Sequence, residues 1–239
     1  MVIQHTSQPI TTGASIIGIK YKDGVLIAGD RMCAYGNSLK YPGVPRIHQA
    51  GDSTLVGCSG EYSDFQHLQH LLDDVDEEDW IEQDGSRRGP KELGSFLGRV
   101  YYNRRSKGDP LWNQLVIGGI KPNGEPHLGY VDLQGTCFEE DFLATGFGLH
   151  LAMPILRKHC DNGKWKTLTE EQARVVVQEC LELLFYRDCK ASCEVQMAFA
   201  RQGKTGKEIV KIEDPYRMKT FWEHKTWMKP GSERGTGSW

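Results

Sequence analysis

The chain has 239 residues, of which 38% are hydrophobic and 26% charged, and its formal net charge is -3 at pH 7. This charge balance gives no support for a nucleic-acid-binding protein, and no apolar run approaches the roughly 18 residues of a membrane-spanning helix. The length suits one large domain. Seven cysteines without a CxxC spacing predict reduced thiols, as in the cytosol or nucleus, rather than disulfides or zinc ligands.

The N-terminal third predicts strands followed by a helix. Two apolar runs, at 16–21 and 25–30, are joined by Lys22-Asp23-Gly24, and an Asp-Gly turn between such runs indicates a β-hairpin. Residues 54–58 predict a further strand, and Ser63 is expected to cap a helix. The inner face of that helix would carry Phe65, Leu68, Leu71 and Leu72.

A charged segment then separates two helices. The acidic run at 73–79, with the glycine- and arginine-rich residues that follow it to 89, predicts a solvated loop. Pro90 fits the first turn of a second helix that runs to about Arg105. Its inner face would carry Leu93, Phe96, Leu97, Val100 and Tyr101.

The second half repeats this alternation. Strands are predicted at 111–120, 128–133, 194–201 and 208–212. A turn at Pro122-Asn123-Gly124 joins the first two. Between the pairs lie a helix at 149–159, with a proline near its middle, and a helix opened by Thr167 or Thr169 that ends at Tyr186. The inner face of the latter would carry Val175, Val176, Cys180, Leu183 and Leu184.

This order, in which strands alternate with pairs of helices, predicts an α+β fold with two antiparallel sheets. The sheets would share a core and the helices would cover their outer faces, giving a four-layer αββα sandwich. Residues 214–239 differ, because their aromatic side chains lie among charges, proline and glycine without a periodic face. We expect this tail to dock on a neighbouring chain. The alternative is a tail that packs on its own domain or is partly disordered.

The segment from Thr12 to Asp30 resembles the opening of a proteasome beta subunit. In catalytic members of that family, a threonine follows the glycine that corresponds to Gly13, and cleavage frees it as an N-terminal nucleophile. Here that residue is Ala14. Further stretches along nearly the whole chain resemble a non-catalytic member: Thr6–Pro9, Tyr101–Lys107, Pro110–Asn113, Gly129–Asp132, Leu143–Gly148 and Tyr186–Asp188.

The resemblance implies the N-terminal nucleophile hydrolase sandwich, which agrees with the predicted layers. It also implies a division of the chain into a propeptide remnant at 1–13, a beta-subunit domain at 14–213 and the tail at 214–239. Removal of the first five residues would make Thr6 the N-terminal residue.

The family's chemistry can be followed residue by residue. A threonine protease needs a hydroxyl nucleophile whose own amine accepts the proton, and Ala14 has no hydroxyl. Arg46 occupies the place of the family's lysine, and it always carries its proton. Asp30 matches the aspartate that holds that lysine, and we expect it to pair with Arg46.

Four further positions complete the comparison. Gly60 matches the glycine whose N–H forms the oxyanion hole, and Asp188 keeps a family aspartate. Phe147 and Ala191 stand where catalytic relatives carry serines. With the nucleophile, the lysine and both hydroxyls lost, the resemblance implies a vestigial site kept as a scaffold.

Other functions would need features that this sequence does not offer. A hydrolase with an unexpected nucleophile would need Ser15, whose side chain should point to the opposite face of the strand, or Thr6, up to roughly 26 Å away from Ala14 in an extended chain. His67 and His70 could suggest a metal pair, but no third ligand is near, so a solvated face is expected. A stand-alone binding protein on the same fold would be a monomer or a symmetric homo-oligomer.

The resemblance therefore implies a non-catalytic structural subunit of the 20S proteasome, without cofactor or metal, in cytoplasm and nucleus. It would support ring assembly and the ATP- and ubiquitin-dependent protein degradation carried out by catalytic neighbours. Its partners would be beta subunits of the same and the opposite ring and subunits of the alpha ring, with no nucleic acid and no membrane. The expected contact residues are Arg104, Arg105, Trp112, Phe221, Trp222 and Trp227.

Overall fold

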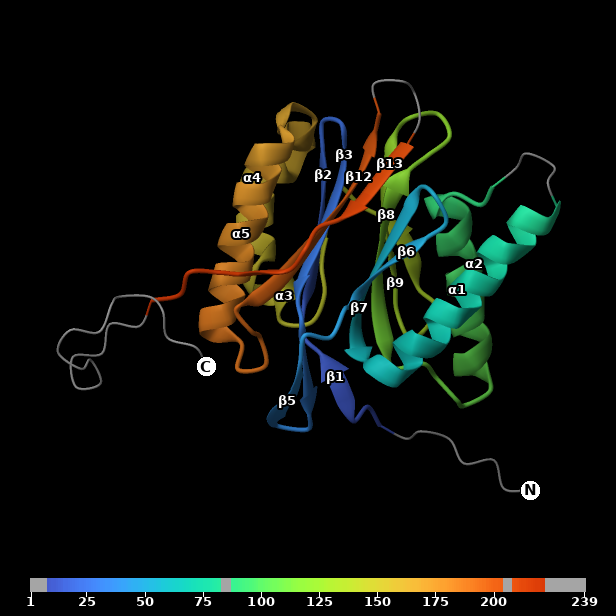
Figure 1. Ribbon diagram of the computed structural model, residues 1–239, viewed down its shortest axis with the longest axis horizontal. Helices are drawn as coiled ribbons and strands as arrows, with labels where there is room; N and C mark the ends of the chain where they lie inside the picture. Colours follow the sequence, from blue (N-terminus) through green and yellow to red (C-terminus); the bar gives the residue numbers. More distant parts are fainter. Residues whose placement is uncertain (1–7, 83–86, 204–207, 222–239) are drawn as a thin grey trace.

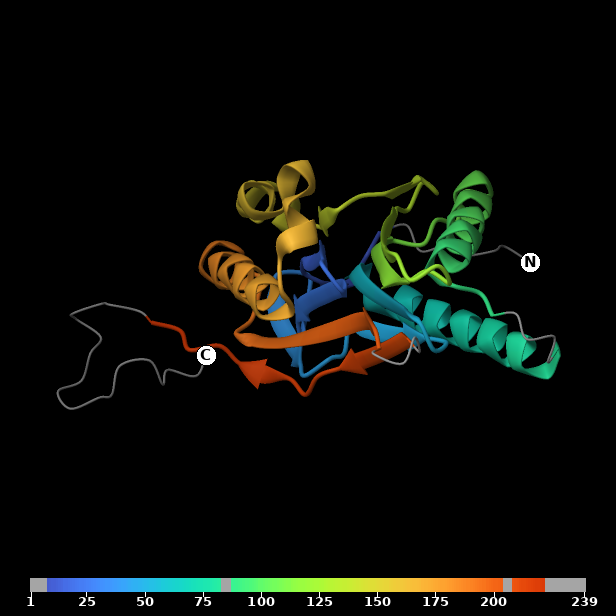
Figure 2. The same ribbon diagram turned by 90° about the horizontal axis from the view of Figure 1, so that it is seen from above.

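The computed structural model describes residues 8–82, 87–203 and 208–221 (Figure 1). Two sheets lie face to face at its centre, with α1 and α2 outside one sheet and α3, α4 and α5 outside the other (Figures 1 and 2). Every strand pair described is antiparallel. The predicted four-layer α+β fold is therefore confirmed.

The larger sheet has the strand order β10-β9-β8-β7-β1-β4-β5, with β6 paired to β7. Its strands are β1 (Thr11–Gly13), β4 (Met32–Tyr35), β5 (Ser38–Pro42), β6 (Ile47–Ala50), β7 (Thr54–Glu61), β8 (Asn113–Ile120), β9 (Pro126–Val131) and β10 (Cys137–Glu139).

The smaller sheet has the order β11-β2-β3-β12-β13, with β14 paired to β12. Its strands are β2 (Ile16–Tyr21), β3 (Gly24–Asp30), β11 (Phe142–Ala144), β12 (Glu194–Gln202), β13 (Glu208–Ile212) and β14 (Tyr216–Arg217). The predicted hairpin of β2 and β3 is confirmed, and both of its strands are buried throughout. Burial on two sides explains why these strands have continuous apolar runs rather than alternation.

The prediction of a loop at residues 73–79 was wrong. The helix α1 (Tyr62–Glu82) continues through the acidic run. Val75 extends the buried stripe of this helix, which also contains Phe65, Leu68 and Leu72. Only Glu77 and Glu78 of this run are good helix formers, so the buried contact of Val75 helps to continue the helix through the aspartates. The second helix, α2 (Pro90–Ser106), begins at Pro90 as predicted.

The helix predicted at 149–159 is divided into α3 (Gly148–Leu151) and α4 (Met153–Cys160). Pro154 lies in the first turn of α4, where its missing N–H leaves no helical bond unmade. A 3-10 segment, η1 (Asp161–Thr167), connects α4 to the next helix.

The helix α5 (Glu170–Arg187) is capped by Thr169, the second of the two candidate caps. The hydroxyl of Thr169 accepts a hydrogen bond from the Gln172 N–H, and the Gln172 side chain accepts one from the Thr169 N–H. Val175 was expected inside but is 61% exposed. The residues buried on this helix are Ala173, Val176, Val177, Cys180, Leu181 and Leu184.

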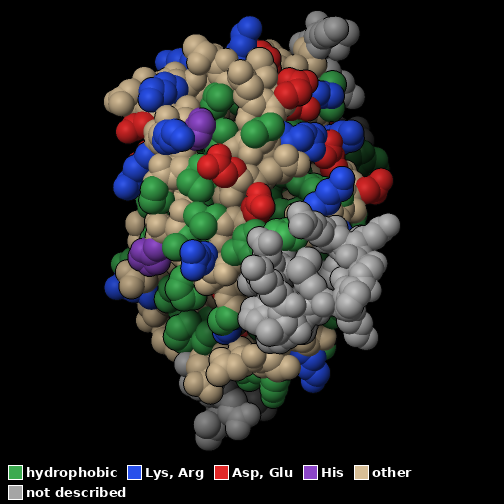
Figure 3. Space-filling model, turned by 90° about the vertical axis from the view of Figure 1, so that its left-hand side faces the viewer, with side chains coloured by type: hydrophobic (Ala, Val, Ile, Leu, Met, Phe, Trp, Pro, Cys, Tyr) green, Lys and Arg blue, Asp and Glu red, His purple; other side chains and the backbone are tan. Residues whose placement is uncertain are grey.

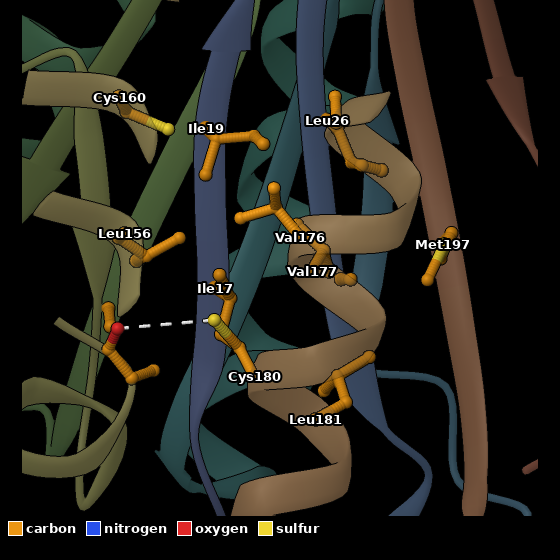
Figure 4. Close-up of a cluster of buried hydrophobic side chains, with 14 of the residues drawn as sticks. Ile17, Ile19, Leu26, Leu156, Cys160, Val176, Val177, Cys180, Leu181 and Met197 are labelled. Atoms are coloured by element: carbon orange, nitrogen blue, oxygen red, sulfur yellow. Dashed lines mark hydrogen bonds between the residues drawn. The ribbon is translucent and has the colours of Figure 1, made fainter. Parts of the chain in front are cut away.

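Figure 4 shows how α5 packs on the smaller sheet, with Val177 and Leu181 beside Ile17 and Met197. The Cys180 thiol donates to the Ala152 carbonyl oxygen at 3.9 Å, which links α5 to the junction of α3 and α4 (Figure 4). A second apolar cluster joins the larger sheet to α1 and α2, and a third fills the space between the two sheets. This packing holds β2 in place, and Ala14 lies just before that strand.

Candidate functional site

Ala14 lies where the chain crosses from one sheet to the other. Gly13, the last residue of β1, pairs with Gly60 and Cys33 in the larger sheet, whereas β2 belongs to the smaller sheet from Ile16 onward. The Ile16 N–H donates to the Thr145 hydroxyl at 2.9 Å, which fixes the start of β2. Ala14 thus sits at the edge of the shared core, in the place that a nucleophile would occupy.

A cavity of about 290 Å³ opens beside Ala14. It brings together four of the predicted site residues, Ala14, Gly60, Phe147 and Asp188, and the predicted contact residue Trp112. Its remaining lining residues are Thr12, Gly13, Ser15, Ser59, Asn113, Gln114, Leu133, Gly146 and Lys190. Asp30 and Ala191 line a smaller neighbouring cavity, together with Ser15 and Asp188.

Arg46 lies under this site with 2% of its surface exposed. Its Nε donates to the Asp30 carbonyl oxygen at 2.8 Å, and Nη1 donates to the carbonyl oxygens of Ala14 at 2.8 Å and Cys58 at 3.3 Å. Its Nη2 donates to the Ser15 carbonyl oxygen at 3.1 Å and to Asp30 Oδ1. Every nitrogen of the guanidinium is therefore hydrogen bonded, and this side chain has no lone pair with which to accept a proton.

The expected Asp30–Arg46 ion pair is present and buried, with 5% of the Asp30 side chain exposed. The second carboxylate oxygen of Asp30 accepts the Ser192 N–H at 3.0 Å. Burial raises the pKa of Asp30, and the positive charge of Arg46 opposes that rise. The carboxylate is thus fully occupied in holding Arg46 and the loop before β12.

The sequence marks Gly13 only as the glycine before Ala14, and the structure shows that it is also necessary for the approach of Arg46. A Cβ atom at position 13 would lie 2.5 Å from the Cδ of Arg46. Only a glycine lets the guanidinium approach β1 closely enough to bind the Ala14 carbonyl. The signal was in the sequence as Gly13 next to Ala14, but its partner lies 33 residues further along the chain.

The remaining family positions have structural contacts. Gly60 has a φ of +95°, and a Cβ there would lie 2.2 Å from the Trp112 carbonyl oxygen. Asp188 is buried and accepts the Lys190 N–H at 2.9 Å, and its own carbonyl accepts the Ala191 N–H at 3.1 Å. Phe147 is 58% exposed at the cavity.

The alternative nucleophiles find no support in this geometry. The Ser15 hydroxyl is buried and accepts the Gly148 N–H at 2.8 Å. Thr6 lies outside the described residues. Burial raises the pKa of the Cys33 thiol to about 11 and that of the Cys58 thiol well above its ordinary value, so both stay protonated near neutral pH.

The expected contact residues are placed as follows. Arg104 pairs with Asp109 of its own chain at 2.8 Å, and the Arg105 guanidinium lies 5.5 Å from the centre of the Tyr102 ring. Phe221 is 41% exposed. Trp222 and Trp227 lie outside the described residues.

The described part of the chain contains no group of three or more His, Cys, Asp or Glu side chains that could hold a metal ion. His67 and His70 are both exposed on α1. Among the helices described, none is long and apolar enough to cross a membrane.

Comparisons with known proteins agree with this geometry. A family model described as "Proteasome subunit" matches residues 10–200. A "Proteasome subunit beta type-4" from Arabidopsis thaliana is 44% identical over 238 residues, which cover 99% of this chain and 92% of that relative. Its counterpart from Dictyostelium discoideum is 42% identical over 218 residues, covering 91% and 81%.

A "Proteasome subunit beta type-7" from Saccharomyces cerevisiae is 38% identical over 224 residues, which cover 88% of this chain and 82% of that relative. The similarity extends over most of both chains, and an alanine stands in the place of the nucleophile. Both findings indicate a non-catalytic member of one family. The chain belongs to the proteasome subunit family, as a non-catalytic beta subunit of the 20S core.

Proposed function

We propose that this subunit acts as an architectural member of the beta ring and that its former catalytic site has become an internal brace. The main support for this proposal is the buried guanidinium of Arg46. It donates hydrogen bonds to the backbone carbonyls of Ala14, Ser15, Asp30 and Cys58. Asp30 belongs to β3, Cys58 belongs to β7, and Ala14 and Ser15 form the crossover between the sheets. The guanidinium is hydrogen bonded to these carbonyls and to the Asp30 carboxylate, and this network holds the wall of the cavity in one shape.

Membership of the family implies association with other 20S subunits. We infer more specifically that the chain contacts neighbours in its own ring, the opposite beta ring and the alpha ring. Exposed apolar side chains support protein contacts on the side of α3, α4 and α5, including Leu149 at 53% and Val175 at 61% exposed. Figure 3 shows hydrophobic side chains spread between charged ones over this side of the molecule.

The tail is proposed to anchor the subunit on a neighbour. Its first residues pack on their own domain, because β14 pairs with β12 and the Met218 N–H donates to the Cys193 carbonyl at 2.9 Å. The Phe221 N–H donates to the Tyr186 hydroxyl at 2.8 Å. Docking on another subunit is therefore assigned to the segment after Phe221, which contains Trp222 and Trp227.

The test is to delete residues 222–239, which spares β14 and the contacts of Phe221. We expect half-particles to accumulate on a native gel, and the peptidase activity per cell to fall because catalytic neighbours lack a closed chamber. Deletion of 231–239 alone, which keeps Trp222 and Trp227 and removes Trp239, is the matched control. Full particles at the normal level after the longer deletion would contradict the anchoring role.

We also propose that the subunit works in the cytoplasm and the nucleus, where the core particle would use it to degrade ubiquitin-marked proteins. Microscopy of a fluorescent fusion to the full chain would test this. Exclusion from the nucleus would contradict the proposal.

A further inference from the structure

The C-terminal part of α1 carries a strong negative charge. Residues 73–82, here called the acidic tip, contain seven acidic residues and no lysine or arginine. The last buried residue of the helix is Val75, so the two turns after it have no core beneath them. Figures 1 and 2 both show this end of α1 extending past the edge of the sheets. The helix therefore continues beyond what the fold of the domain requires.

The charges of the acidic tip are unfavourable for an isolated helix. A helix C-terminus carries a partial negative charge, which disfavours carboxylates, and the last turn of α1 has no basic residue. The guanidinium of Arg88 compensates part of this negative charge. Its Nη1 forms an ion pair with Glu78 Oε2 at 3.3 Å, and its Nε forms one with Asp79 Oδ1 at 3.2 Å. Asp74 and Glu77 are exposed and have no ion-pair partner among the residues that the structure describes.

Two large apolar side chains lie beside these carboxylates. Trp80 is 64% exposed and Ile81 is 69% exposed. Glu77 precedes them by three and four residues, so all three share one face of the helix. Tryptophan is enriched at the energetic centres of protein interfaces, and an exposed pair of this kind has apolar area to bury.

We propose that Asp74, Glu77, Trp80 and Ile81 form a docking surface for a basic segment of another protein. Lysine or arginine side chains of that segment pair with the two carboxylates and offset the charge at the helix end, while its apolar side chains cover Trp80 and Ile81. Nucleic acid and anionic lipid are excluded by repulsion. A second copy that met this surface through its own acidic tip would bring negative charge against negative charge. This surface depends on neither the former catalytic site nor the tail.

The experiment uses the full chain in the assembled particle, with the photo-cross-linking residue p-benzoylphenylalanine at position 80. Cells are irradiated, the particle is purified through another subunit, and the cross-linked peptides are identified by mass spectrometry. The yield is compared between the parent chain, Glu77→Lys and Glu140→Lys, the last being an exposed acidic residue outside α1. Lysine and glutamate have nearly equal helix propensity, so Glu77→Lys should leave α1 folded.

We expect the cross-link to map to a segment that contains lysine or arginine beside apolar residues. Glu77→Lys should lower its yield about fivefold or more, and Glu140→Lys should not. The same segment, synthesised as a peptide, should bind particles that contain Glu77→Lys about fivefold more weakly than particles that contain the parent chain. The proposal is overturned if no cross-link forms, if it maps to a neutral or acidic segment or to a second copy, or if Glu77→Lys leaves the yield unchanged.

Discussion

Replacing Arg46 with methionine tests whether the former catalytic site is now a brace. The substitution keeps an apolar stem but leaves the carboxylate of Asp30 without its counter-charge in a place where 5% of that side chain is exposed. Removing one partner of a buried ion pair costs about 3–5 kcal/mol. The total stability of a domain is about 5–15 kcal/mol, so this one change should remove a large fraction of it.

The loss is measured by chemical denaturation of the purified full chain and by the amount of the variant found in assembled particles. Arg201→Ala is the matched control, because that arginine pairs with Glu170 at 2.9 Å while 42% of its side chain is exposed. An exposed pair contributes about 0–1 kcal/mol. Adding Asp30→Asn to the methionine variant removes the stranded charge and should restore part of the lost stability.

Two results would refute this reasoning. One is a loss for Arg46→Met no larger than that of Arg201→Ala, with normal incorporation into particles. The other is a double variant with no recovery, because the stranded charge of Asp30 would then not be the cause. Either result would mean that the residues at this site persist without bracing it.

Three further predictions concern the site and the fold. Ala14→Thr should give neither peptidase activity nor an epoxyketone adduct by intact mass, because Arg46 cannot replace the lysine; an adduct would contradict this. Gly60→Ala should destabilise the chain by more than about 2 kcal/mol in denaturant, since its Cβ would lie 2.2 Å from the Trp112 carbonyl at a φ of +95°; an unchanged midpoint would count against it. Burial lowers the pKa of His127 from 6.5, so the stability that depends on its neutral form is present above pH 6.5 and lost as the pH falls towards the folded-state pKa. His127→Gln should flatten that acid-side loss in melting temperature, and an unaltered pH profile would exclude this histidine as its cause.

The main elements could be predicted because each has a local cause. Two apolar runs and an Asp-Gly turn predict the buried hairpin of β2 and β3, and Pro90 predicts the start of α2. The short strands β1, β4, β5 and β6 were not predicted, because three to five residues carry too little periodicity to be recognised alone. Their pairing partners, rather than their own residues, make them strands. The acidic run of α1 was misassigned because its charges outweighed the single buried contact of Val75.

By itself, the sequence determined that no hydroxyl stands at position 14 and that an arginine replaces the lysine at position 46. Those are chemical identities, and they exclude the threonine mechanism without any coordinates. Only the tertiary structure decided what Arg46 does instead. Its partners, Ala14, Ser15, Asp30 and Cys58, lie between 12 and 32 residues away in the chain. Hydrogen bonds act over about 3 Å, so such a cluster exists only after the two sheets have packed together.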